Sequence, residues 1–68
     1  MANFSKVMVR LAAFTECIDH VKAMAVAAER QGRESTPGSA HRDLGLHAGG
    51  VLYGAVTELE RLRDAEVE

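Results

Sequence analysis

Apolar residues in the first half of the chain recur alternately three and four residues apart. An α-helix gathers residues with this spacing into one narrow stripe, whereas a β-strand would need a period of two. The pattern therefore predicts a helix over about 4–31 with a single seam for packing against another helix. The series consists of Phe4, Val7, Leu11, Phe14, Ile18, Val21, Ala25 and Ala28.

A cluster of glycine, proline and hydroxyl residues interrupts the pattern at 32–39 and predicts a turn there. Gly32 is suited to end the first helix, because glycine adopts the left-handed conformation common at that position. Either Thr36, with Pro37 at the first helical position, or Ser39 can cap the helix that follows.

The second helix, predicted over about 40–65, has its own heptad series at Ala48, Leu52, Ala55, Leu59 and Leu62. A short turn between two helices makes them antiparallel neighbours. We therefore expect one all-α domain, 1–68, folded as an antiparallel two-helix hairpin. Its predicted core consists of Phe4, Val7, Leu11, Phe14, Ile18, Val21, Leu52, Ala55, Leu59 and Leu62.

Glycines at 45, 49, 50 and 54 lie inside the second helix, although each costs about 1 kcal/mol relative to alanine. The pairs Gly45/Gly49 and Gly50/Gly54 share faces and would let two backbones approach closely, which indicates contact with a second chain. The alternative is a weak or kinked helix around Gly49 and Gly50.

Between Leu44 and Val56 the second helix is apolar on more than one face, and the first helix can cover only one of them. Exposed apolar patches mark interfaces, and a chain of 68 residues is marginally stable alone. We therefore expect the hairpin to dimerise into a four-helix bundle. The predicted partner or dimer interface consists of Leu44, Leu46, Ala48, Gly49, Val51, Leu52, Tyr53 and Val56.

Residues with metal-binding or nucleophilic chemistry do not form a recognisable site in the sequence. His41, Asp43 and His47 lack the one-turn pairing of histidines that a zinc helix uses, and Cys17 with His20 supplies only two ligands. We expect no metal, no cofactor and no enzymatic activity. Cys17, beside the apolar seam and without a basic cluster, is expected to be a buried or half-buried structural thiol.

The formal net charge of −2 gives no electrostatic footprint for nucleic acid, and we expect no membrane segment because the N-terminus lacks a long apolar run. A reducing, cytoplasmic setting fits the single cysteine. Arg30, Arg33 and Arg42 cluster around the turn, so a DNA-associated regulator or antitoxin is one alternative. A metal- or haem-linked sensor that uses Cys17 and the histidines is another.

The layout resembles that of short helical-hairpin proteins of unknown function from pseudomonads and their phages. The resemblance depends on an alanine-rich stretch with an isolated Cys17, at 11–18, and on Arg42-Asp43-Leu44 opening the second helix. It implies a bacterial or phage protein that binds an unidentified host protein, which it inhibits or modulates. It assigns no functional residue.

Overall fold

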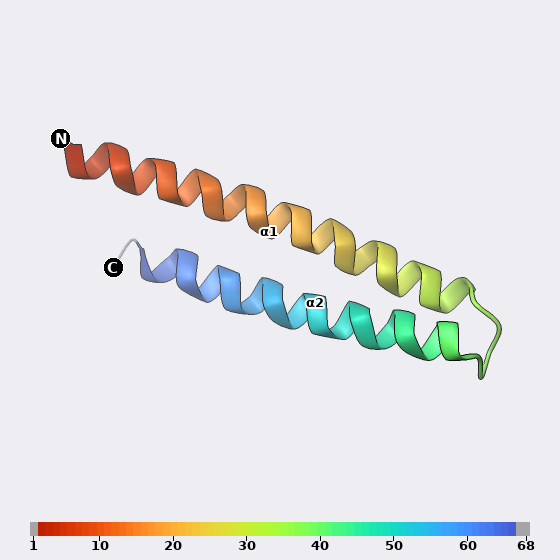
Figure 1. Cartoon of the computed structure of the whole chain (residues 1–68). Coiled ribbons are helices and arrows are strands. Elements are labelled where there is room, and N and C mark those ends of the chain that lie inside the picture. Colours follow the sequence, from red (N-terminus) through yellow and green to blue (C-terminus); the bar gives the residue numbers. More distant parts are fainter. Residues whose placement is uncertain (1, 67–68) are drawn as a thin grey trace.

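Two long helices make up the whole fold of the computed structural model, which describes residues 2–66 and the side chains of 6–66. Helix α1 spans Ala2–Glu34 and helix α2 spans Ala40–Ala65, and the two lie side by side in opposite directions (Figure 1). No strand occurs within 2–66. The predicted all-α antiparallel hairpin is confirmed.

The turn between the helices is short, because α1 continues past the glycine expected to stop it. Gly32 lies within α1, whereas the left-handed glycine of the turn is Gly38, with φ of 80°. Ser39 is the N-cap of α2, and its hydroxyl oxygen accepts a hydrogen bond from the backbone N–H of Arg42 at 3.2 Å. The structure thus selects Ser39 over Thr36 as the cap.

Helix α1 packs on α2 through the heptad series that its sequence shows. Ile18 and Ala25 are buried and the other described members are half-buried, while their neighbours up to Ala27 are exposed. The same spacing continues through Gly32, which is buried, to Ser35. The side chain of Phe4, the first predicted member, lies outside the described residues.

Helix α2 presents a different set of residues to α1 from the one that its leucines and alanines predict. Ala55 and Leu62, which the sequence assigns to the core, are exposed, Leu62 by 40%. The residues that face α1 instead begin with two glycines, and this inner series consists of Gly45, Gly49, Leu52, Val56 and Leu59.

The physical reason is a close approach of the two backbones near the turn. A methyl group built on Gly45 would lie 2.6 Å from the α-carbon of Gly32, and one built on Gly32 would lie 2.8 Å from the backbone nitrogen of Leu46. These distances leave no room for any side chain. The expected close approach therefore occurs at Gly45, but against α1 of the same chain, whereas Gly50 and Gly54 face open space.

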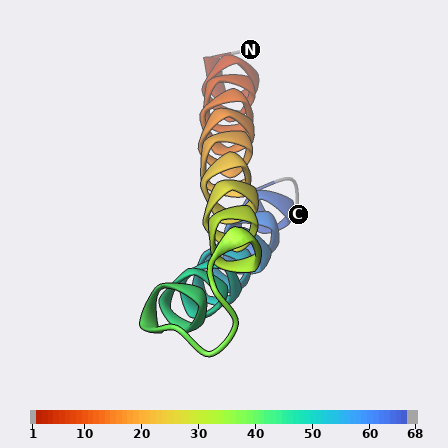
Figure 2. The same cartoon turned by 90° about the vertical axis from the view of Figure 1, so that its right-hand side faces the viewer.

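The hairpin is an elongated rod, 56 Å long, 15 Å wide and 10 Å thick. Its radius of gyration is 15.9 Å, whereas a compact chain of this length would have one of about 11 Å. Viewed from the turn end, the helices cross at a shallow angle in a single layer (Figure 2). Within the described residues only Ile18, Ala25 and Val56 are buried hydrophobic residues, so both broad faces of the layer are left to solvent.

Candidate protein-interaction surface

One of the two broad faces of the hairpin is lined by small and apolar residues from both helices. Two shallow grooves between the helices lie on it. One is lined by Ala13, Phe14, Cys17 and Leu59, with Arg10 at its end. The other, near the turn, is lined by Ala28, Leu44, Gly45 and Ala48 together with the polar Gln31, Ser35 and His41. Residues three or four positions from those that line the grooves share the same side of each helix and therefore belong to the same face. We call it the apolar face, and its exposed members are Ala13, Cys17 and Met24 of α1 and Leu44, Ala48, Val51, Ala55 and Leu62 of α2.

Large apolar side chains stand out from this face. Leu44 is 65% exposed, Val51 59% and Met24 47%, all well above what a packed core allows. No lysine, arginine, aspartate or glutamate interrupts its members from Ala13 to Met24 on α1 or from Leu44 to Ala55 on α2. Such an uncharged, contiguous surface is typical of an interface rather than of a free exterior.

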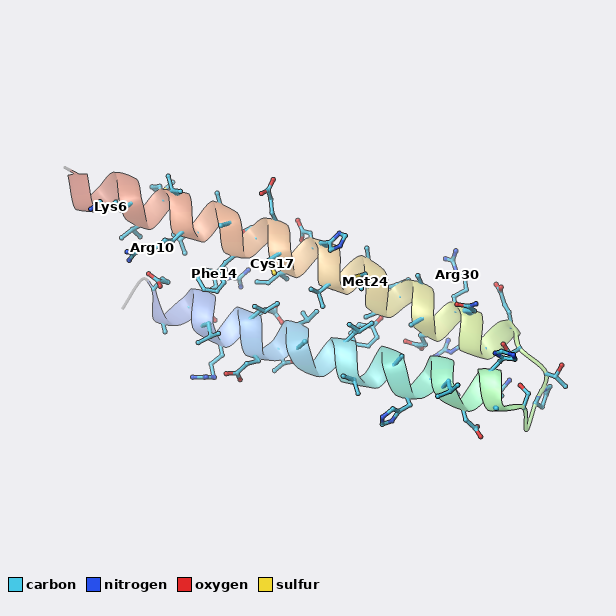
Figure 3. The ribbon with its side chains drawn as sticks, in the orientation of Figure 1. Lys6, Arg10, Phe14, Cys17, Met24 and Arg30 are labelled. Atoms are coloured by element: carbon cyan, nitrogen blue, oxygen red, sulfur yellow. The ribbon has the colours of Figure 1, made fainter. Side chains whose placement is uncertain are left out.

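The opposite broad face has a mixed, charged character, and we call it the charged face. A groove between Val26 and Tyr53 is bordered by Glu29, Arg30 and Arg33, with Glu34 at its end. Glu29 and Arg33 form an ion pair one turn apart. Val26 and Tyr53 are 44% and 37% exposed, and Leu46, seven residues before Tyr53, is 39% exposed. Figure 3 shows Arg30 projecting from α1 away from α2, into solvent.

The interface predicted from the sequence is divided by the fold into three environments. Gly49, Leu52 and Val56 face α1 and are buried or half-buried within the hairpin. Leu46 and Tyr53 lie on the side of the charged face. Leu44, Ala48 and Val51 lie on the apolar face and are exposed.

Cys17 is exposed rather than buried, which corrects the expectation of a buried thiol. Its neighbour Ile18 points at α2, and the rotation of about 100° per residue turns Cys17 onto the apolar face, into the groove that Phe14 and Leu59 line. Sequence reasoning missed the α1 part of this face, although Cys17 and Met24, seven residues apart, already share one side of that helix. Figure 3 labels both side chains.

Two of the three arginines around the turn, Arg33 and Arg42, are engaged in contacts within the chain. Arg33 pairs with Glu29, and the half-buried Arg42 donates from Nη1 to the carbonyl oxygen of Arg33 at 3.4 Å. His20, His41 and His47 are exposed, and no group of three or more potential metal ligands occurs within the part of the chain that the structure describes.

Neither described helix has the length and hydropathy needed to cross a membrane. The sequence matches no protein-family model, no curated protein and no solved structure. The shape and chemistry of the two faces are therefore the basis for a functional proposal.

Proposed function

We propose that this protein is a small, non-enzymatic protein-interaction module whose apolar face completes a helical bundle with another chain. The observation that supports the proposal is the imbalance between what the hairpin buries and what it exposes. Three hydrophobic residues are buried in the described chain, while Met24, Leu44, Val51 and Leu62 stand exposed on one face. A second pair of helices laid on that face would give the two-layer packing on which helical bundles depend.

We propose two partners for this protein. One is a second copy of the chain, and the other is an unidentified protein that it inhibits or modulates. The resemblance to hairpin proteins of pseudomonads and their phages supports a bacterial host and a phage or mobile-element origin, and the single cysteine supports a cytoplasmic location. The turn gives less support to a DNA-associated regulator, because Arg33 and Arg42 are engaged within the chain and acidic Glu29 and Glu34 lie beside them.

A matched pair of valine substitutions tests the proposal. Val51→Glu places a charge on the apolar face, and Val26→Glu makes the same change on the charged face; both positions are exposed, by 59% and 44%. In one experiment, wild type and the two variants are immobilised and used to capture proteins from a bacterial lysate. In a second, the mass of each purified protein in solution is measured by light scattering. Circular dichroism verifies that each variant keeps its helicity.

We expect wild type and Val26→Glu to associate with a protein chain, either themselves or another, and Val51→Glu to lose that association by at least tenfold. A glutamate in a desolvated contact must be neutralised or expelled, which is the physical reason for the loss. If Val51→Glu retains every association of the wild type, the apolar face is not the binding surface and the proposal fails.

A further inference from the structure

We infer that α2 can pack on α1 in a second register, rotated about its own axis so that leucines take over the contact that a glycine and a valine now make. The rotation withdraws part of the apolar face into the hairpin and so regulates its availability. We call the observed packing the glycine register and the rotated packing the leucine register. The rotation is a property of the isolated chain, and only its consequence for binding rests on the proposed function.

The glycine register leaves the larger apolar side chains of α2 incompletely covered. The buried residues of α2 are Gly49 and Val56, whereas Leu52 and Leu59 beside them are only half-buried. Leu62, one turn further on, is 40% exposed. The observed contact therefore uses the smaller residues and leaves apolar area of the leucines in water.

The row of α2 that holds the two buried residues has a charged residue at each end. Seven-residue spacing places Arg42 before Gly49 and Arg63 after Val56, and both arginines are half-buried. An arginine covers apolar surface with its stem while its charged head stays in water. These two positions therefore limit how completely this row can be buried against α1.

A second row of α2, on the other side of Leu52 and Leu59, is more apolar at these levels. Its members also recur every seven residues and are all exposed: His41, Ala48, Ala55 and Leu62. Gly45, Leu52 and Leu59 lie between the two rows, so they belong to the contact in either register. The second row and these shared residues contain the heptad series that periodicity predicts for α2.

A rotation of α2 by about 60° exchanges the two rows. The exchange moves the contact line by three residues, and three residues turn an α-helix by about 300°, which equals about 60° in the opposite sense. Gly45, where an added methyl group would lie 2.6 Å from the α-carbon of Gly32, stays in the contact and acts as the pivot. The rotation breaks the exposed hydrogen bond of 3.4 Å from Arg42 to the carbonyl oxygen of Arg33.

The rows beside the seam of α1 differ from those of α2, because both contain charged residues near their middle or end. One row includes Lys22 and Glu29, and the other includes Arg10. Rotating α1 would therefore bring charge toward the contact, which costs free energy unless the charge is paired. The second register is thus specific to α2, while α1 keeps its orientation.

Two opposing effects distinguish the registers. The leucine register buries more apolar area, whereas the glycine register brings the two backbones closer and gains van der Waals contacts. The leucine register also turns Ala48, Ala55 and Leu62 away from the apolar face. A partner that binds the apolar face therefore holds the chain in the glycine register, because a ligand favours the state that it binds better.

A larger residue at position 49 tests the inference in the full chain. Gly49 belongs to the contact only in the glycine register, where an added methyl group would already lie 3.3 Å from the β-carbon of Glu29. Gly49→Val should therefore force α2 into the leucine register. Gly45→Val is the matched control, because Gly45 faces α1 in both registers and no rotation relieves the clash. Circular dichroism measures the helicity of both variants.

Two thiol reporters, each in a Cys17→Ser background, follow the rotation. Ala55→Cys is exposed in the glycine register and covered in the leucine register, and Val56→Cys, at a position that is 5% exposed, reports the reverse. Iodoacetamide alkylates each thiolate with loss of iodide, and mass spectrometry gives the rate. The protein concentration is kept low enough that the chain is monomeric, so that association does not cover the thiols.

We expect Gly49→Val to remain helical, to slow the alkylation of Ala55→Cys by about tenfold and to accelerate that of Val56→Cys by about tenfold, because a buried thiol is inert. Gly49→Ala should shift both rates in the same directions by less. Gly45→Val should lose helicity and leave both thiols fast.

Two results would overturn the inference. One is loss of helicity in Gly49→Val to the same extent as in Gly45→Val, which would mean that α2 has a single register. The other is a helical Gly49→Val in which Ala55→Cys still reacts faster than Val56→Cys. Neither result bears on the proposed function, which is decided by the associations of wild type and Val51→Glu.

Discussion

Two sides of α2 have the same heptad spacing, but one packs against α1 and the other is exposed. The inner series faces α1, and Gly49 and Val56 in it are buried; the outer series belongs to the apolar face and is exposed. Each series has two leucines and one valine, but the inner one has two glycines where the outer one has two alanines. The difference teaches that backbone approach at the glycines, and not the number of large apolar side chains, decides which side of α2 packs on α1. The inner series is Gly45, Gly49, Leu52, Val56 and Leu59, and the outer series is Leu44, Ala48, Val51, Ala55 and Leu62.

The largest loss of stability is expected at the glycine of the inner series where the backbone of α1 leaves no room for a side chain. Gly45→Val should destabilise the hairpin by about 3 kcal/mol, because the atoms that the new side chain meets belong to the backbone of α1 and cannot swing aside. A small single-core chain has only about 3–5 kcal/mol to lose. Thermal unfolding followed by circular dichroism should therefore show a melting temperature far below that of the wild type.

Gly54→Val is the matched control, since a side chain at Gly54 meets open space. It should keep the wild-type helicity. If Gly45→Val also melts at the wild-type temperature, the helices do not cross at Gly45 and Gly32, and the assignment of inner and outer sides would have to be reversed.

A second comparison uses the same residue type on the two sides. Val56 is 5% exposed and Val51 is 59% exposed. Val56→Ala should lower the free energy of unfolding by about 1.5 kcal/mol, at about 0.8 kcal/mol for each buried carbon removed. At a protein concentration low enough to keep the chain monomeric, Val51→Ala should change the free energy of unfolding by less than about 0.5 kcal/mol.

Urea unfolding at two protein concentrations separates the two roles. Raising the concentration should stabilise the wild type and Val56→Ala, because association favours the folded chain, and should stabilise Val51→Ala less. If Val51→Ala and Val56→Ala lower the free energy of unfolding equally at low concentration, Val51 is covered within the monomer.

The register of α1 could be read from its sequence, whereas that of α2 could not. In α1 one series is apolar throughout, whereas the residues beside it are mostly polar or alanine with scattered apolar ones such as Met24 and Val26. Periodicity alone therefore points Ile18 inward, as the structure has it. In α2 two overlapping series share Leu52 and Leu59 and differ by a small rotation of the helix. Periodicity favours the series with Ala55 and Leu62, because it counts apolar residues and does not weigh how closely glycines let backbones approach.

The candidate surface, too, could be predicted only in part from the sequence. Leu44, Ala48 and Val51 were identified by the excess of apolar residues in the first half of α2. Cys17 and Met24 were missed, because only the direction in which α2 packs decides which flank of α1 adjoins those residues. That direction depends on the contact of Gly32 with Gly45, which is distant in sequence and has no apolar signal of its own.

Replacing a glycine with open space around it should stabilise the hairpin. Gly50→Ala should raise the free energy of unfolding by about 1 kcal/mol, because the helix gains the better propensity of alanine and the new methyl group meets nothing within 4 Å. The measurement is urea unfolding at one protein concentration beside wild type. A weakened dimer in light scattering would instead mean that another chain packs against Gly50, away from the apolar face.

The smallest effect concerns Glu58, which occupies the outer spacing between Ala55 and Leu62. The hydrogen bonds from Arg61, followed by its positive charge, hold the pKa of the Glu58 carboxyl below its usual value of 4.5. A folded-state pKa below the unfolded one means that this pair stabilises the hairpin above the unfolded pKa. That contribution is lost as the pH falls through the folded pKa, below 4.5.

Carboxyl chemical shifts measured by NMR against pH should therefore give a midpoint for Glu58 below 4.5 in the wild type and a higher one in Arg61→Gln. Arg63→Gln is the control, because Arg63 pairs with Asp64 and should leave Glu58 unchanged. Both residues of the Glu58–Arg61 pair are well exposed, so the effect on stability is small and weakens with added salt. A Glu58 midpoint that is the same in wild type and Arg61→Gln would show that the pair does not persist in solution, and that this carboxylate is free to turn toward a second chain.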